Sequence, residues 1–183
     1  MSSRFAGEDF CEGDPMVHVL QKPATEKMSL DDFFLLVSDM LGWKYAHGSC
    51  SYGEVDCVGV YRFPMYWYYS QSAYKKLGAD GTIVDYLYEN GVYNEDVGST
   101  IKRKGKITES TTLVPGMGLF MWGEKNGEKK FLHVAIYVGD LFDGYSNAVI
   151  EAVESGVVIR ELETSEAING KFTHFGFFSG LEY

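Results

Sequence analysis

The chain has 183 residues, a length that suits one domain with a sizeable core, and 45% of them are hydrophobic. Its 16 basic and 26 acidic residues give a net charge of −10, which argues against nucleic-acid binding because a phosphate backbone calls for a basic surface. No stretch approaches the roughly 18 apolar residues that span a bilayer, so we expect no membrane insertion.

The N-terminal residues, MSSRFAGEDFCEGD, contain no apolar core of a secretory signal, so we expect synthesis in the cytoplasm. Residues 1–28 show little periodicity and are expected to form an irregular arm ahead of a single domain at residues 29–183. The three cysteines are an odd number and indicate no disulfide framework. The four histidines show no metal-binding spacing, so we expect neither a metal site nor another cofactor.

Three helices are predicted in the first half of the chain, over residues 29–42, 58–77 and 82–91. Ser29 is the expected N-cap of the first helix, and the apolar positions that follow lie near one face. Residues 44–55 are rich in glycine and serine and are predicted to form a loop. Pro64 interrupts the second helix, where we expect a kink or a break.

The second half of the chain has the composition of strands. Residues 94–112 are polar and charged, a loop with room for one strand, and LFMWG and FLHVAIYVG follow as strands. AVIEAV, ESG and VVIREL predict a hairpin, and KFTHFGFF a last strand. Helices followed by a mostly antiparallel sheet indicate an α+β fold.

Cys57 is the strongest candidate nucleophile, because it follows a glycine-rich loop and opens a predicted helix. A cysteine reacts as its thiolate, which the unpaired N–H groups of a first helical turn favour. Those groups could also hold an oxyanion, and Gly53 and Gly59 would leave room for a substrate. The alternative is a buried structural cysteine.

The base for such a cysteine is expected to be a histidine from another element. His133 lies near the start of the apolar strand FLHVAIYVG, where a histidine needs a polar partner. The alternative is a core histidine bonded to a backbone carbonyl. His174 is a rival on the last strand, and His47, in the loop before the cysteine, is placed to touch a substrate.

Five motifs occur in a characteristic order. They are Tyr45 with Gly48, DCVG at 56–59, PGMGLF at 115–120, HVAIYVG at 133–139 and VIEAVESGVVIREL at 149–162. Together they resemble the NlpC family of bacterial cell-wall cysteine peptidases, which have a papain-like fold. The resemblance covers roughly residues 30–178 and implies N-terminal helices packed on a mostly antiparallel sheet.

The resemblance also implies roles for individual residues. Cys57 matches the family's nucleophile and His133 its general base. Tyr45 matches a tyrosine near the oxyanion site, and Asp56 matches an acid that helps bind the free amine of the substrate peptide.

The family's third catalytic residue is a polar group on the strand after the histidine, and here that position holds Glu151. A carboxylate can orient an imidazole and favours its protonated form. The alternative is a glutamate that points to solvent at a strand edge, and Asn147 and Glu154 are the reserve candidates.

Two features depart from the family or stand outside its motifs. Val58 follows the nucleophile where the family commonly has serine, which puts the usual substrate specificity in doubt. The segment IKRKGK is the one basic cluster, and it either lines the cleft or is a solvated loop.

The resemblance implies a cysteine hydrolase that cleaves amide or isopeptide bonds in peptidoglycan stem peptides, typically between D-glutamate and the diamino acid. The expected partners are muropeptides and, in a phage or prophage lysin, tail or other assembly proteins. A cytoplasmic enzyme that trims recycled wall peptides fits equally. The alternatives are a catalytically silent scaffold or wall-binding module, and an amidase or acyltransferase with a non-wall substrate.

Overall fold

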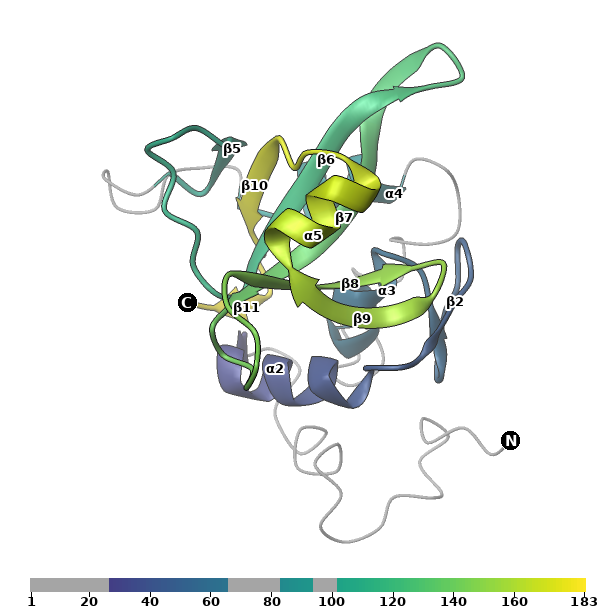
Figure 1. Cartoon of the computed structure of the whole chain (residues 1–183), viewed down its shortest axis with the longest axis vertical. Coiled ribbons are helices and arrows are strands. Elements are labelled where there is room, and N and C mark those ends of the chain that lie inside the picture. The colour runs from purple at the N-terminus through teal and green to yellow at the C-terminus, as the bar shows by residue number, and fades with distance from the viewer. Residues whose placement is uncertain (1–26, 66–82, 94–101) are drawn as a thin grey trace, which may run out of the picture.

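A six-stranded antiparallel sheet forms the centre of the computed structural model, which describes residues 27–65, 83–93 and 102–183 (Figure 1). The order of its strands is β5 (Lys104–Lys106), β10 (His174–Phe177), β6 (Met117–Lys125), β7 (Glu128–Gly139), β8 (Ala148–Val153) and β9 (Gly156–Glu161). The architecture is α+β, and the predicted antiparallel strands and the hairpin between β8 and β9 are confirmed.

The hairpin of β6 and β7 extends beyond the rest of the molecule at the top of Figure 1. Its turn residues, Asn126 and Gly127, have φ angles of 55° and 78°. Two consecutive left-handed residues match the right-handed twist of the flanking strands, which is why Asn-Gly is a frequent hairpin turn. This turn holds the two longest strands in register up to the base of the hairpin, where His133 lies.

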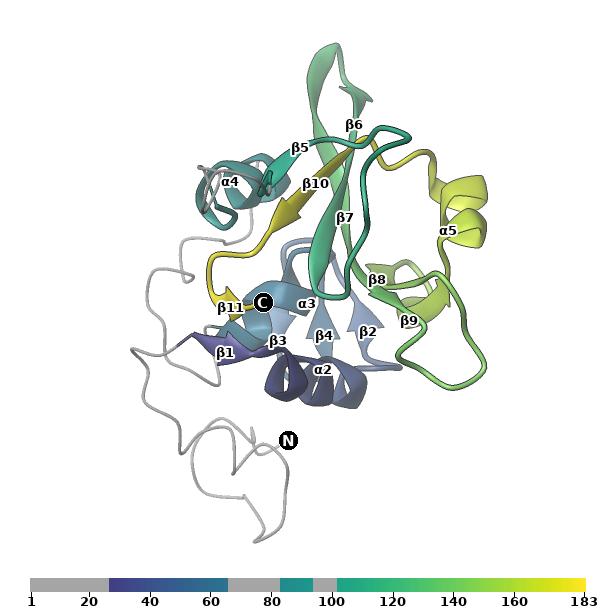
Figure 2. The same ribbon diagram turned by 90° about the vertical axis from the view of Figure 1, so that its left-hand side faces the viewer.

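Helices cover both faces of the sheet. Side chains of α2 (Leu30–Asp39), α3 (Gly59–Phe63) and α4 (Ile83–Asn90) share one core with Val134, Ile136 and Ile150 of the sheet. The opposite face, with Leu119, Ala135 and Val149, is covered in part by α5 (Leu162–Asn169) (Figures 1 and 2). The α5 helix was not predicted, because it is weakly amphipathic and its N-cap, Glu161, makes no side-chain capping bond.

Residues at the helix ends explain where α2 begins and where α3 ends. The Asp32 N–H donates to Oγ of Ser29 at 3.2 Å, so the predicted N-cap is confirmed. Helix α3 ends at Phe63, with Pro64 at its C-cap. The rest of the predicted 58–77 helix, from residue 66 onward, lies outside the described residues.

Two small sheets complete the fold. β2 (Lys44–Tyr45), β4 (Glu54–Val55) and β3 (Cys50–Ser51) form a three-stranded sheet, which corrects the prediction of a plain loop at 44–55. β1 (Met28–Ser29) pairs in parallel with β11 (Leu181–Glu182). Met28 is fully buried, so the ordered domain includes the last residue assigned to the N-terminal arm, while residues 1–26 lie outside the described part.

The described helices include none that is long and apolar enough to cross a membrane.

Packing requires a glycine at position 59, whereas the sequence analysis expected Gly59 to leave room for a substrate. A Cβ atom at this position would lie 2.7 Å from Cβ of Val55 and 3.1 Å from the backbone oxygen of Ser49. Val55 belongs to β4 of the small three-stranded sheet, and Ser49 directly precedes its strand β3. The glycine therefore allows α3 to sit directly against that sheet.

We expect Gly59→Ala to lower the free energy of unfolding by about 1–3 kcal/mol, the usual cost of overpacking a rigid contact. Urea unfolding of the variant and the wild type measures the difference. Gly123→Ala is the matched control, because its Cβ would meet a rotatable methyl of Leu132 at 2.7 Å. An equal loss in both variants would show that removal of glycine, rather than the contact with Val55, matters.

Candidate active site

Asp56 fixes the position of Cys57 at the N-terminus of α3. Its Oδ1 accepts a hydrogen bond from the Gly59 N–H at 2.7 Å, and its Oδ2 accepts one from the Gly48 N–H at 3.1 Å. The carboxylate thus caps α3 and ties the preceding loop to it. Burial raises the pKa of Asp56 and outweighs the effect of these two N–H groups, which lower it. The predicted contact of Asp56 with a substrate amine stays a prediction.

A β-bulge next to His133 directs its side chain. The register between β6 and β7 shifts after Met121, which pairs with His133, while Trp122 pairs with Phe131. Phe131 and Val134 consequently belong to the same core cluster although they are three residues apart. Without the bulge, an odd spacing would place these two side chains on opposite faces. His133 points to the other face, toward β8.

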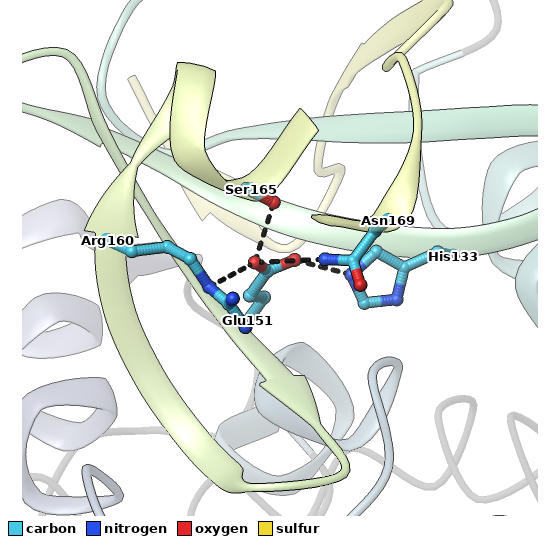
Figure 3. Close-up of polar contacts among 5 residues, drawn as sticks. All are labelled: His133, Glu151, Arg160, Ser165 and Asn169. Atoms are coloured by element: carbon cyan, nitrogen blue, oxygen red, sulfur yellow. Dashed lines mark hydrogen bonds and ion pairs between the residues drawn. The ribbon is translucent and has the colours of Figure 1, made fainter. Parts of the chain in front are cut away.

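Cys57, His133 and Glu151 form one chain of contacts. Cys57 interacts with the His133 imidazole closely enough to raise its pKa, and the two residues line the same cleft. On the far side of the ring, Nε2 of His133 lies 2.6 Å from Oε2 of Glu151, which leaves Nδ1 for the cysteine (Figure 3). The structure therefore brings together the three residues that the sequence singled out for nucleophile, base and orienting group.

Glu151 is completely buried, on the same face of β8 as Val149. Its Oε1 accepts a hydrogen bond from Oγ of Ser165 at 2.6 Å and lies 3.5 Å from Nδ2 of Asn169 (Figure 3). Nε of Arg160 lies 2.9 Å from the same oxygen in an orientation that makes no hydrogen bond, so Arg160 acts through its charge. The solvent-facing alternative for Glu151 is thereby excluded.

The ion pair shifts the pKa values of both partners. Burial lowers the pKa of His133, but the hydrogen bonds and charges of Cys57 and Glu151 outweigh it and raise the pKa to about 9. Burial raises the pKa of Glu151, yet His133, Ser165 and Arg160 together hold it below its ordinary value. Both shifts favour an imidazolium beside a carboxylate.

A cleft of about 280 Å³ opens in front of the cysteine. Its lining comprises Tyr45, His47, Asp56, Cys57, Val58, Val84, Lys125, Asn126, Lys130, Phe131, Leu132 and His133. Burial raises the pKa of the Tyr45 phenol, and the charges of Cys57 and Asp56 raise it further. Tyr45 is therefore a protonated hydroxyl close to the sulfur, which can donate a hydrogen bond to an oxyanion.

The other candidates take no part in this chain of contacts. His174 packs edge-on against Phe131 on β7, and its Nδ1 lies 2.8 Å from Oγ1 of Thr173. Asn147 accepts a hydrogen bond from the Tyr137 hydroxyl, and Glu154 is exposed in the turn between β8 and β9.

Two features that stood outside the family pattern can now be located relative to the cleft. Val58 is among the residues that line it, although the residue is only 1% exposed and belongs to the core. The basic segment at 102–106 lines a different cavity. The lysines of the cleft are Lys125 and Lys130, from the hairpin of β6 and β7.

Sequence reasoning missed Ser165 and Arg160, the two residues that compensate the charge of Glu151 from other elements. Arg160 pairs with Val149 across the two strands and therefore reaches Glu151 diagonally. The predicted hairpin and its ESG turn contained enough register information to place Arg160. Ser165 had no such signal, because its helix was not predicted.

In the described part of the chain, no group of three or more His, Cys, Asp and Glu side chains is arranged to hold a metal ion.

No protein-family model and no curated protein matches the chain. Among solved structures, it is similar to NlpC1 from Trichomonas vaginalis, with a TM-score of 0.51 and 18% identity over 81% of this chain and 44% of NlpC1. It is also similar to NlpC2 from the same organism, with a TM-score of 0.52 and 15% identity over 87% of this chain and 49% of NlpC2. The fold is thus NlpC-type, as predicted, and the chain spans less than half the length of either protein.

The raised pKa of His133 makes stability depend on pH. Between its ordinary pKa of 6.5 and its folded pKa of about 9, the native state holds a proton that the unfolded chain releases. The stabilisation is full below pH 6.5 and is lost as the pH rises through 9. We expect urea unfolding to show this decline, and His133→Gln to flatten it. A wild-type profile that stays level or rises over this range would contradict the raised pKa.

The charge of Arg160 is expected to matter only while Glu151 is anionic. We expect Arg160→Met to lower the free energy of unfolding by about 3 kcal/mol, because it leaves a buried charge with less compensation. In a Glu151→Gln background the same substitution should cost less, with an interaction energy of about 0.5–3 kcal/mol in a double-mutant cycle.

The matched control for Arg160→Met is Lys171→Met. Lys171 forms an ion pair of 3.0 Å with Glu166, but its side chain is 82% exposed. A surface pair of this kind contributes about 0–1 kcal/mol. Equal losses for the two variants, or strict additivity with Glu151→Gln, would contradict the role assigned to Arg160.

Proposed function

We propose that this chain is a cysteine hydrolase that cleaves amide or isopeptide bonds in peptidoglycan stem peptides, between D-glutamate and the diamino acid. The observation that carries the proposal is the chain of contacts from Cys57 through His133 to the buried Glu151. The NlpC-type fold supports it, and the sequence resemblance to the NlpC family implies a nucleophile and a base at these two positions. The substrate class follows from the family resemblance alone.

In the first half of the reaction, the Cys57 thiolate attacks the carbonyl carbon of the scissile bond. The oxyanion that forms accepts hydrogen bonds from the Cys57 backbone N–H and the Tyr45 hydroxyl. The Gly59 N–H is not part of this hole, because Asp56 already occupies it. His133, which carries a proton at neutral pH, donates it to the departing amine, and an acyl-enzyme remains.

In the second half, water attacks the acyl-enzyme and His133, now neutral, accepts a proton from it. The tetrahedral intermediate collapses, the acid product leaves, and the thiolate and imidazolium are restored. Glu151 acts as a positioning residue throughout. It holds Nε2 of the imidazole at 2.6 Å, so that Nδ1 faces the sulfur in both steps.

The biological setting remains part of the proposal. A phage or prophage lysin, or a tail-associated hydrolase, would act on the cell wall after release or within a virion, beside assembly proteins. A cytoplasmic enzyme would trim recycled wall peptides. Both settings supply muropeptides as the partner, and they call for the same chemistry from the cleft.

The silent-scaffold alternative loses one of its two supports in the structure. It rested on Val58 and Glu151 as departures from the family pattern. Glu151 makes the contact with His133 that an orienting residue needs. Val58 remains a departure, because it lines the cleft without the hydroxyl that the family commonly has there. An amidase or acyltransferase with a non-wall substrate would use the same three residues. Only an experiment distinguishes it from the proposed peptidoglycan hydrolase.

The decisive experiment incubates the chain with purified muropeptides and follows the products by mass spectrometry. We expect cleavage that adds one water, no cleavage by Cys57→Ala, and a rate for Glu151→Gln that is lower by up to about 10⁴-fold, as for the loss of an orienting carboxylate in a catalytic triad. In parallel, iodoacetamide near pH 6 should alkylate Cys57 faster than Cys50, and His133→Ala should remove this preference.

The two readouts separate the alternatives. Preferential alkylation of Cys57 without muropeptide cleavage would overturn the wall substrate and favour another acyl transfer. Alkylation of Cys57 no faster than that of Cys50, together with no cleavage, would overturn the enzyme and favour a scaffold.

A further inference from the structure

A second cavity in the described part of the chain is larger than the catalytic cleft. It has a volume of about 730 Å³, within the usual range for small-molecule sites, and shares no lining residue with the cleft. Its lining comprises Lys102, Arg103, Lys106, Thr108, Ser110, Thr111, Thr112, Val114, Met117, Phe175, Phe177 and Tyr183. We call it the β5 cavity, because its lining includes residues of β5 and of the segment that follows. Figure 2 shows β5 at the edge of the sheet, next to β10.

The charge of the β5 cavity is opposite to that of the whole chain. Among the described residues that line it, three are cationic and none is acidic, in a chain with 26 acidic and 16 basic residues. A concave site lined by one sign of charge concentrates ligands of the opposite sign. The cavity therefore favours an anion although the protein as a whole repels one.

The floor of the cavity is apolar. Met117 of β6 and Phe175 and Phe177 of β10 are buried members of the second core cluster, and Val114 packs against it. An inorganic anion alone would leave this surface uncovered. The floor calls for a ligand whose body is aliphatic or aromatic.

The cationic wall is held in place by the sheet. The backbone oxygen of Arg103 accepts from the Phe177 N–H at 2.8 Å, and the Ile107 N–H donates to Thr173 at 2.8 Å. The Arg103 guanidinium lies over the Phe177 ring at 4.8 Å. Both ends of the basic segment are therefore anchored to β10, so that binding would require little ordering of this wall.

The wall of the cavity that carries hydroxyl groups is a turn whose residues are hydrogen-bonded to one another. The Thr108 N–H donates to Oγ1 of Thr111 at 2.9 Å, and the Thr111 N–H donates to the Thr108 oxygen at 3.0 Å. Oγ of Ser110 lies 3.0 Å from Oγ1 of Thr108. Hydroxyls can donate to the oxygens of a phosphate, sulfonate or carboxylate, so this wall complements the cationic one.

We propose that the β5 cavity is a second ligand site, which binds a small amphiphilic anion with its charged group between Lys102, Lys106 and the hydroxyl turn and its apolar body on Met117, Phe175 and Phe177. Two sources share this chemistry, a lipid-like phosphate and a free aromatic or aliphatic acid. The proposal is independent of the proposed hydrolase activity, because the site contains none of the cleft residues.

The test uses 8-anilinonaphthalene-1-sulfonate, an aromatic sulfonate whose fluorescence rises on binding, with the full chain. We expect saturable binding with one site, and displacement by both octyl phosphate and an aromatic carboxylate but not by inorganic phosphate. Preference for octyl phosphate or for the carboxylate identifies the source. A neutral analogue, N-phenyl-1-naphthylamine, should bind at least about tenfold more weakly because it lacks the charge.

The charge of the site is tested by Lys102→Glu/Lys106→Glu, which should weaken binding by about tenfold or more. The matched control is Lys44→Glu/Lys129→Glu, which changes the net charge equally at two exposed positions outside the cavity. Its affinity should stay within about twofold of wild type. Equal weakening in both double variants would overturn the proposal, because net charge alone would then explain binding.

The location is tested by NMR of the methyl groups. Met117 should shift on titration with the sulfonate, while Leu132, which lines the catalytic cleft, should not. Shifts confined to Leu132, or no saturable binding in the wild type, would overturn the proposal.

Discussion

The structure depends on the burial of one negative charge. Glu151 has no exposed surface, and an isolated carboxylate in such a place would cost far more than the net stability of a domain of this size. It is tolerated because a charge from β9, a hydroxyl from α5 and an imidazole from β7 converge on its two oxygens. The contacts that stabilise the buried carboxylate also fix the orientation of the His133 ring and keep the ring protonated. Stability and chemistry therefore share one set of interactions.

The two faces of the sheet have different roles, because alternate side chains of each strand point to opposite faces. One face packs against α2, α3 and α4 and forms the larger core, and the other carries Glu151 and the second cluster. The nucleophile belongs to the first side and its orienting carboxylate to the second. The bulge beside His133 joins them, because it changes the alternation of β7 at the point where the imidazole must reach both partners.

The second face has two chemical environments along its length. Near β8 and β9 it holds a compensated ion pair under α5, and near β10 it forms the apolar floor of the β5 cavity. The basic segment beside β5 is too far along the sheet to serve the cleft, where Lys125 and Lys130 of the long hairpin supply the positive charge instead. The two cavities thus differ in both lining and location, which permits separate ligands.

The sequence by itself determined the features that depend on neighbouring residues or on strand alternation. The cap at Ser29 and the hairpin of β8 and β9 follow from such local rules, and the order of motifs pointed to Cys57 and His133. Only the tertiary structure decided which elements meet. The contact of Ser165 with Glu151, the packing reason for Gly59 and the place of the basic segment depend on distances between elements far apart in the chain, and no periodicity or spacing encodes these distances.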